Sequence, residues 1–300
     1  MDDAEQWVSE ILGRQNGVIA RGQALETGMT RARVRHKLET GRWAAVHPGV
    51  YRSVEQPFSA VSRVRAAELW AGRNAFLYGH AAAWWWGLTP IEPAQVTVVI
   101  PLTENRRARA GIKVIRRALP YPDRAWYRCA KVTALALSAL TGSVVLGPGG
   151  GAVLDRALQT KVTLADVRAS HYRNLGTRGS RQAGTLLRAA ADRSASMSER
   201  MFIKLLRDAG IRGWRVNHVW QPSSSESTVD VAFIAERVAI EIDGWAWHHT
   251  PDRFQRDRTK QNQLTAAGWT VLRFTWFDIT TRPDEVVGAV RDALVRARTR

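Results

Sequence analysis

Three carboxylates lie close together in the last third of the chain, namely Asp230, Glu241 and Asp243. Two β-rich runs carry them, and a short break at Ala235-Glu236 separates the runs, so the pattern predicts an antiparallel hairpin. In that hairpin Asp230 lies directly opposite Glu241, with Cβ atoms about 5 Å apart, and Asp243 lies further along the same face. Carboxylates placed in this way repel one another, and a protein that keeps them together usually supplies a cation.

The chemistry open to such a face is metal binding. Carboxylate oxygens are ligands that Mg²⁺ prefers, so we expect Asp230 and Glu241 to hold Mg²⁺, or Mn²⁺ in its place, together with water and a substrate phosphate. The opposite face of the hairpin is apolar, and its burial sets the register. Its residues are Val229, Val231, Phe233, Val238, Ile240 and Ile242. The alternative is an exposed sheet face whose acids are only solvated.

Hydrolysis of a phosphodiester also needs a group that moves a proton near neutral pH. His248 follows Asp243 just past the expected end of the strand, where it would reach the attacking water or the leaving oxygen. The alternative for His248 is a packing histidine. Arg253 and Arg256 lie on the next expected helix, which begins with Thr250 as its N-cap, and they would bind phosphate.

Charge and cysteine content limit the class of protein. Lys and Arg number 44 against 27 Asp and Glu, which gives a formal net charge of +17. This excess favours nucleic acid first and an anionic membrane surface second, although a high-GC coding bias would also enrich Arg. The single Cys129 excludes an intramolecular disulfide and a thiolate zinc site, and it fits a reducing cytoplasm. The N-terminus lacks the regions of a secretory signal, and glycines interrupt the uncharged run 132–154, so we expect no membrane span.

The N-terminal residues predict two helices around a turn at Gly28, followed by two short strands around Pro48-Gly49. Thr30 is a good N-cap for the second helix. Basic side chains crowd this helix, namely Arg31, Arg33, Arg35 and Lys37. The pattern is typical of a winged helix-turn-helix, with the basic helix in the major groove of DNA and the strands on the backbone. The alternative is a small helical domain whose Arg face is solvated.

A family resemblance supports DNA binding by this part. A short apolar strand, an ALxxxG helix, an Arg-rich helix that ends in Gly, and a strand with Gly49, Val50 and Tyr51 follow in order. This order resembles the N-terminal domain of AbiEi-type antitoxins, and the likeness in layout extends over roughly residues 10–170. Those antitoxins are DNA-binding autoregulators of abortive-infection toxin-antitoxin operons. The resemblance therefore implies DNA and a cognate toxin as partners.

Three consecutive tryptophans, Trp84, Trp85 and Trp86, would suit a platform on which bases stack. Consecutive helical residues point in three directions, however, and the alanines from Ala81 to Ala83 indicate close helix packing. We therefore expect these indoles mainly in the core.

The C-terminal part predicts the element order α-β-β-β-α-β-α. Its first helix is expected to open at Ser196, which has capping-box spacing to Glu199. With Glu199 on the first helix, Asp on one strand and Glu-x-Asp on the next, this order resembles the restriction-endonuclease-like PD-(D/E)XK nucleases. It is more narrowly similar to the subgroup around very short patch repair endonucleases, through the IEIDG-x-x-x-H segment from Ile240 to His248.

This resemblance covers about residues 196–297 and implies a set of site residues. The implied catalytic residues are Asp230, Glu241, Asp243, His248 and Glu199. One departure is Asp243, which stands where the common superfamily pattern has Lys. In the repair-nuclease subgroup the downstream His takes over proton transfer, which points to His248.

We therefore expect an α/β multidomain protein with three parts. These are a winged helix-turn-helix over residues 1–55, an AbiEi-like α+β domain over 56–190 and a restriction-endonuclease-like α/β/α domain over 196–300. The leading hypothesis is a cytoplasmic DNA-binding protein with Mg²⁺-dependent endonuclease activity. The alternative is a transcriptional autoregulator or antitoxin of AbiEi type whose nuclease fold is inactive. RNA is kept as a less favoured substrate, because the basic charge and the nuclease fold do not distinguish RNA from DNA.

Overall fold

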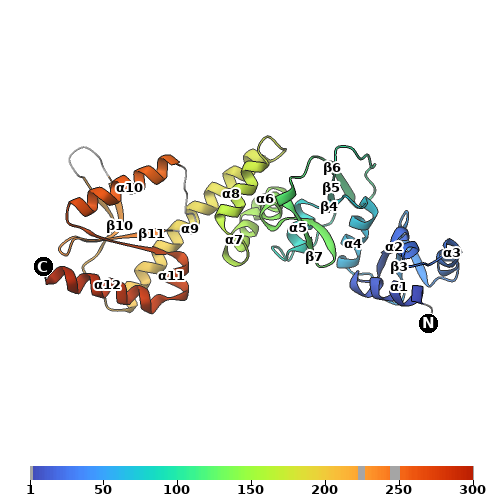
Figure 1. Ribbon diagram of the computed structural model, residues 1–300, viewed down its shortest axis with the longest axis horizontal. Coiled ribbons are helices and arrows are strands. Elements are labelled where there is room, and N and C mark those ends of the chain that lie inside the picture. The colour runs from blue at the N-terminus through green and yellow to red at the C-terminus, as the bar shows by residue number, and fades with distance from the viewer. Residues whose placement is uncertain (1–2, 222–226, 244–250, 300) are drawn as a thin grey trace. The chain divides into compact units, whose positions relative to one another are not determined.

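The computed structural model describes residues 3–221, 227–243 and 251–299 (Figure 1). By their contacts the residues group into two compact units, of which unit 1 comprises 1–162 and 166–186, and unit 2 comprises 163–165 and 187–300. The expected domain division at residue 55 stays a prediction. Within the described ranges, no helix combines the length and the apolar composition that crossing a membrane requires.

The first part of unit 1 has helices and strands at the expected residues. In order they are α1 (Asp3–Arg14), β1 (Val18–Ala20), α2 (Arg21–Glu26), α3 (Arg31–Glu39), β2 (Trp43–His47) and β3 (Val50–Ser53). The strands form a three-stranded antiparallel sheet in the order β1-β3-β2. Thr30 is the N-cap of α3, as predicted, because its hydroxyl accepts a hydrogen bond from the Arg33 N–H at 3.2 Å. Val34 of α3 packs in a buried core with Ile19 and Trp43.

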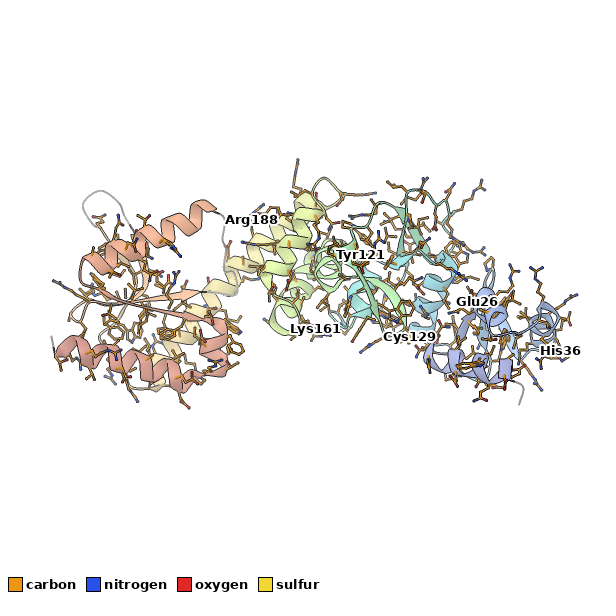
Figure 2. All side chains as sticks on the ribbon, viewed as in Figure 1. Glu26, His36, Tyr121, Cys129, Lys161 and Arg188 are labelled. Atoms are coloured by element: carbon orange, nitrogen blue, oxygen red, sulfur yellow. The ribbon has the colours of Figure 1, made fainter. Side chains whose placement is uncertain are left out.

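The rest of unit 1 is a five-stranded sheet with helices packed against it (Figure 1). The strands are β4 (Phe76–Leu77), β5 (Val96–Ile100), β6 (Ile112–Arg116), β7 (Arg124–Tyr127) and β8 (Ala130–Thr133), in the order β6-β5-β4-β8-β7. The helices are α4 (Ala60–Ala71), α5 (Gly79–Trp85), α6 (Leu135–Val145), α7 (Gly150–Thr160) and most of α8 (Leu164–Arg173), with 3₁₀ turns η1 (Tyr121–Asp123) and η2 (Gly147–Gly149). Arg128 and Cys129, both at positive φ, make the two-residue turn between β7 and β8 (Figure 2).

The three consecutive tryptophans pack inside unit 1, which confirms the expectation of a core role. Trp85 is buried, and its indole N–H donates to the Tyr127 carbonyl at 2.9 Å. The Trp86 indole N–H donates to the Thr133 carbonyl at 2.9 Å, and its ring stacks on Tyr127 with centroids 4.1 Å apart. Trp84 is partly buried against the same core.

The helix that leads into unit 2 begins earlier than the sequence predicted. Helix α9 (Ser180–Asp208) starts at Ser180, so Ser196 and Glu199 lie inside it, and the expected capping box at Ser196 is wrong. The Gly-, Ser- and Arg-rich composition suggested a domain junction here, and the division between the two units falls within this segment, between residues 186 and 187. The helix is continuous through the division, and its buried apolar residues include Ala183 and Leu187, which are spaced to share one helix face.

Unit 2 is built on a four-stranded sheet in the order β12-β11-β10-β9. Its strands are β9 (Arg215–Trp220), β10 (Ser227–Phe233), β11 (Val238–Asp243) and β12 (Thr270–Thr275). Its helices are the end of α9, α10 (Pro251–Ala266), α11 (Trp276–Thr281) and α12 (Pro283–Arg298). Strands β11 and β12 are parallel, and the other neighbouring pairs are antiparallel. The predicted order of elements is confirmed, with the short α11 as an addition.

Helices cover both faces of this sheet (Figure 1). One face packs on α9 and α12 through a cluster that includes Phe202, Phe233 and Val290. The other face packs on α10 through Leu264. Val229 packs in the cluster with Leu264, whereas Val231 and Phe233 pack in the first cluster. The sheet is thus the middle layer of an α/β/α arrangement.

The hairpin of β10 and β11 has the predicted register. Val231 pairs with Ile240 and Phe233 with Val238, across a four-residue turn. The same register, continued by one residue, sets Asp230 opposite Glu241. Because α10 packs on that face, the alternative of an open, solvated sheet face is wrong.

Candidate functional site

Asp230 and Glu241 occupy neighbouring strands on the sheet face that α10 covers. The Asp230 Oδ2 accepts a hydrogen bond from the Ile242 N–H at 2.7 Å. This bond crosses from β10 to β11 and holds the Asp230 carboxylate beside the strand that carries Glu241. Both acids are partly buried.

A lysine on α10 supplies a cation to these acids. The Lys260 Nζ lies 2.7 Å from the Glu241 Oε1, and the two side chains are 19% and 17% exposed. The same ammonium group donates to the Thr228 carbonyl. Sequence reasoning missed Lys260. The available signal was its spacing from the apolar Leu264, since residues four apart share a helix face and Leu264 packs on the sheet.

Strand β12 adds a second basic residue beside the acids. In the parallel pairing of β11 and β12, Arg273 is the partner of Glu241. Glu241, Lys260 and Arg273 line the same small cavity, together with Gln261. The sequence predicted this strand, but not its position next to β11, so Arg273 was also missed.

Glu199 approaches the same acids from α9. Burial raises the pKa of the Glu199 carboxyl, and the negative charge of Asp230 raises it further. The sequence therefore selected a residue that the fold brings into the electrostatic range of Asp230, although the expected capping role of Glu199 is wrong.

Burial is the main cause of the raised pKa of each of the Asp230 and Glu241 carboxyls, and Lys260 and Arg273 oppose it. Burial raises the pKa of Asp230, and it raises the pKa of Glu241 to about 7. Lys260 lowers the pKa of Glu241, and the charge of Asp230 raises it. Raised carboxyl pKa values that arise from burial and like charge are typical of sites that bind cations or move protons.

The donor set suits a hard divalent cation, because Asp230 and Glu241 offer carboxylate oxygens. Among the residues that the structure describes, no group of three or more His, Cys, Asp and Glu is arranged to hold a metal ion. A metal ion would therefore depend on these two carboxylates and on oxygens from water and phosphate. It would also compete with the Lys260 ammonium for Glu241.

Several expected site residues lie outside the described part of the chain. His248 falls in the segment 244–250, and the side chains of Asp243, Arg253 and Arg256 also lie outside it. The Asp243 backbone ends β11 and pairs with Thr275. The roles of these four side chains stay predictions.

The basic residues of α3 differ in their surroundings. Arg31 and Arg35 are exposed, and Arg33 is half-buried. The Lys37 Nζ lies 2.9 Å from the Glu5 carboxylate, so this lysine ties α3 to α1. Among the basic residues of α3, Arg31 and Arg35 are therefore the two that present their charge to solvent.

Comparison with known proteins bears on the C-terminal part. The family model REase_MTES_1575, of the restriction-endonuclease-like class, matches residues 199–294. The type II nicking enzyme V.NaeI of Lentzea aerocolonigenes is 39% identical over 15% of this chain and 37% of its own length. An uncharacterized protein found in two strains of Mycobacterium tuberculosis is 26% identical over 90% of this chain and 99% of its own length. The C-terminal part therefore contains a restriction-endonuclease-like domain, as the sequence predicted.

Proposed function

We propose that this protein is a metal-dependent endonuclease that cuts one strand of DNA. The observation that carries the proposal is the pair of Asp230 and Glu241 beside Lys260 in a restriction-endonuclease-like domain, with Glu199 within the electrostatic range of Asp230. The similarity to a nicking enzyme favours cleavage of one strand.

The residues of the site would have separate roles in metal binding, phosphate contact and proton transfer. Asp230 and Glu241 would hold Mg²⁺, or Mn²⁺, which when bound offsets charge on the phosphate and activates a water molecule. Lys260 would turn from Glu241 to the substrate phosphate, while its contact with the Thr228 carbonyl keeps it at the site. This gives Lys260 a role near the phosphate in a chain that has Asp243 where the superfamily pattern has Lys. His248 would move the proton.

The N-terminal part would bind DNA as a winged helix of the AbiEi type. Helices α2 and α3, followed by β2 and β3, have the order that this function needs, and Arg31 and Arg35 are exposed on α3. The net charge of +17 supports binding to the phosphate backbone. A cognate toxin, which the AbiEi resemblance implies, belongs to this proposal as a partner.

Plasmid nicking tests the enzyme proposal. The purified wild type should convert supercoiled DNA to open circles with Mg²⁺ and stop when EDTA is added. Asp230→Asn should abolish nicking, while the control Asp292→Asn, which changes an exposed carboxylate on α12, should cut like the wild type. The absence of wild-type cleavage on duplex, mismatched and single-stranded DNA, with Mg²⁺ and with Mn²⁺, would refute the proposal.

A second function has one observation in its favour. Lys260 already occupies the Glu241 carboxylate, which suits a nuclease fold kept for binding without catalysis. The protein would then act as a DNA-binding autoregulator of AbiEi type. In that case Arg31→Ala with Arg35→Ala would remove salt-dependent operator binding, and no metal ion would elicit cleavage. Matched DNA and RNA ligands at one salt concentration would decide between the two nucleic acids.

A further inference from the structure

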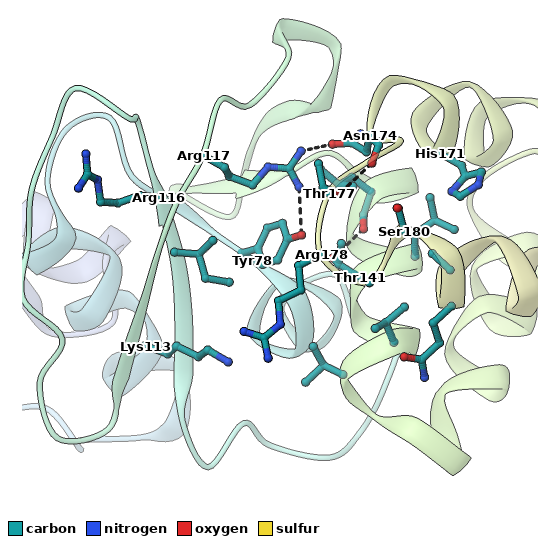
Figure 3. A pocket seen from close by; sticks show the side chains of 18 of the residues that line it. Tyr78, Lys113, Arg116, Arg117, Thr141, His171, Asn174, Thr177, Arg178 and Ser180 are labelled. Atoms are coloured by element: carbon teal, nitrogen blue, oxygen red, sulfur yellow. Dashed lines mark hydrogen bonds between the residues drawn. The ribbon is translucent and has the colours of Figure 1, made fainter.

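A cavity of about 860 Å³ opens within unit 1, well apart in sequence from the acids of β10 and β11 (Figure 3). Its walls come from β6 and the residue after it, from α6, from the turn before α9 and from the first turn of α9. The volume lies in the range of protein pockets that bind small molecules, about 300–1,000 Å³.

The cavity carries basic side chains that face one another. Lys113 of β6 and Arg178 of the turn before α9 extend toward each other in Figure 3. Within the described ranges, neither side chain forms an ion pair, and none of the residues that line the cavity is Asp or Glu. Two neighbouring cations without a carboxylate repel each other, so a bound anion would relieve that repulsion.

A third cation, Arg117, is held in a fixed position at the edge of the same space. Its guanidinium donates to the Tyr78 hydroxyl at 3.2 Å and to the Asn174 amide oxygen (Figure 3). Asn174 is buried and donates in turn to Asp123 at 2.7 Å. Arg117 is thus a pre-positioned positive charge, which lowers the entropy cost of binding an anion.

The opposite wall of the cavity is apolar. Helix α6 contributes Leu137, Leu140, Val144 and Val145, and α9 contributes Ala183. The exposed Gln182 on the first turn of α9 adds an amide that can pair with the edge of a base. A ligand that fits both walls has an anionic group at one end and a flat, largely apolar group with polar edges at the other.

We propose that this cavity binds a nucleoside phosphate, with the phosphate between Lys113 and Arg178 and the base against α6. The ligand is either a free nucleotide or one unpaired nucleotide of a DNA strand. This site goes beyond the proposed nuclease function and does not depend on it, because its residues all belong to unit 1.

Binding to the full-length protein separates the two sources of the ligand. Equilibrium dialysis with adenosine monophosphate measures the free nucleotide, and anisotropy of a labelled oligodeoxyadenylate measures the strand. Saturable binding of the free nucleotide that the oligonucleotide does not displace assigns the site to free nucleotides. Binding of the oligonucleotide that depends on Lys113 and Arg178, with competition by the free nucleotide, assigns it to an unpaired base.

Three variants test the placement of the phosphate. Lys113→Ala with Arg178→Ala should weaken binding by at least about tenfold, since hydrogen bonds to charged groups are strong. Gln182→Glu should weaken it as well, while the new acid on the first turn of α9 favours the helix and leaves the fold intact. Arg156→Ala is the matched control, because Arg156 is an exposed arginine on α7 of unit 1 that does not line the cavity.

The control should bind like the wild type, and all variants should melt at the wild-type temperature. Three results would overturn the proposal. The first is the absence of binding for both probes. The second is equal binding by the wild type and the Lys113→Ala, Arg178→Ala variant. The third is a preference for decyl phosphate over the nucleotide, which would mean that α6 accepts an alkyl chain rather than a base.

Discussion

Two glutamates, one in each unit, lie against a basic side chain in the interior. In unit 1, Glu68 is 3% exposed, and its two oxygens accept hydrogen bonds from Arg65 and from the Lys131 N–H at 3.3 Å. In unit 2, Glu241 contacts Lys260. Burial raises the pKa of both carboxyls, but at Glu241 a neighbouring carboxylate, Asp230, raises it further.

The surroundings of the two glutamates distinguish a structural ion pair from a functional one. Glu68 has a partner for each oxygen, and the largest effects on its pKa after burial come from cations and donors. Glu241 has Lys260 and Arg273 beside it, but it also has a second acid, Asp230, in its surroundings. A fully partnered buried pair holds the fold together, whereas two acids buried side by side favour the entry of a further cation.

The largest effect should come from breaking the structural pair. Glu68→Ala leaves the Arg65 guanidinium buried without its anion, and we expect a loss of about 3–5 kcal/mol in the free energy of unfolding. Urea denaturation followed by tryptophan fluorescence measures it. The control Glu26→Ala removes an exposed partner of Arg73 and should cost less than about 1 kcal/mol. Equal losses in the two variants would mean that the pair in the interior contributes no more than the surface one.

Substitution of Glu241, in the functional pair, should reduce activity and leave the free energy of unfolding nearly unchanged. Glu241→Gln removes a proposed metal ligand, so we expect nicking to slow by about 100-fold, or ~2.7 kcal/mol in activation free energy. The free energy of unfolding should change by less than about 1 kcal/mol, because the substitution also removes repulsion with Asp230. Kinetics and urea denaturation on one preparation measure both quantities. A large loss of stability with unchanged nicking would place Glu241 with Glu68.

Removal of the lysine should reveal competition between ammonium and metal. Lys260→Met leaves Asp230 and Glu241 without this cation, so we expect a loss of about 1–2 kcal/mol in the free energy of unfolding without metal. Mg²⁺ should then raise the melting temperature of the variant more than that of the wild type, since the metal binds only the folded acids. Lys204→Met changes an exposed lysine paired with Asp208 and serves as the control. The same Mg²⁺ response in all three proteins would contradict a shared carboxylate.

The partly exposed carboxylate of Asp278 should give the smallest of these effects. The Thr275 hydroxyl and N–H donate to Asp278, and these hydrogen bonds lower the pKa of Asp278. A lowered pKa in the folded state means stability that is present at neutral pH and is lost as the pH falls through that value. Asp278→Ala should therefore cost about 0.5 kcal/mol at neutral pH and progressively less below about pH 4. Thermal unfolding across this pH range measures the difference, and a cost that does not change with pH would exclude an electrostatic origin.

Much of the fold could be predicted from local patterns. The hairpin register follows from alternating apolar residues around an even-numbered turn, and the N-cap at Thr30 follows from the side chain that precedes a helix. The start of α9 could not be predicted in this way. Ser196 has the chemistry of a helix cap, but α9 runs through it, with buried residues on both sides at Ala191 and Phe202.

In the candidate site, too, local patterns predict some features and tertiary packing places the others. Strand alternation is enough to predict that Asp230 and Glu241 share a sheet face, because the two-residue period of a strand is a local property. Packing between segments is what places α10 over that face, brings Lys260 to Glu241 and sets Arg273 beside them on β12. Those contacts join segments far apart in the chain, and they depend on how helices and strands pack rather than on the spacing within any one of them. The same reason explains why the cavity between Lys113 and Arg178 appears in no local motif.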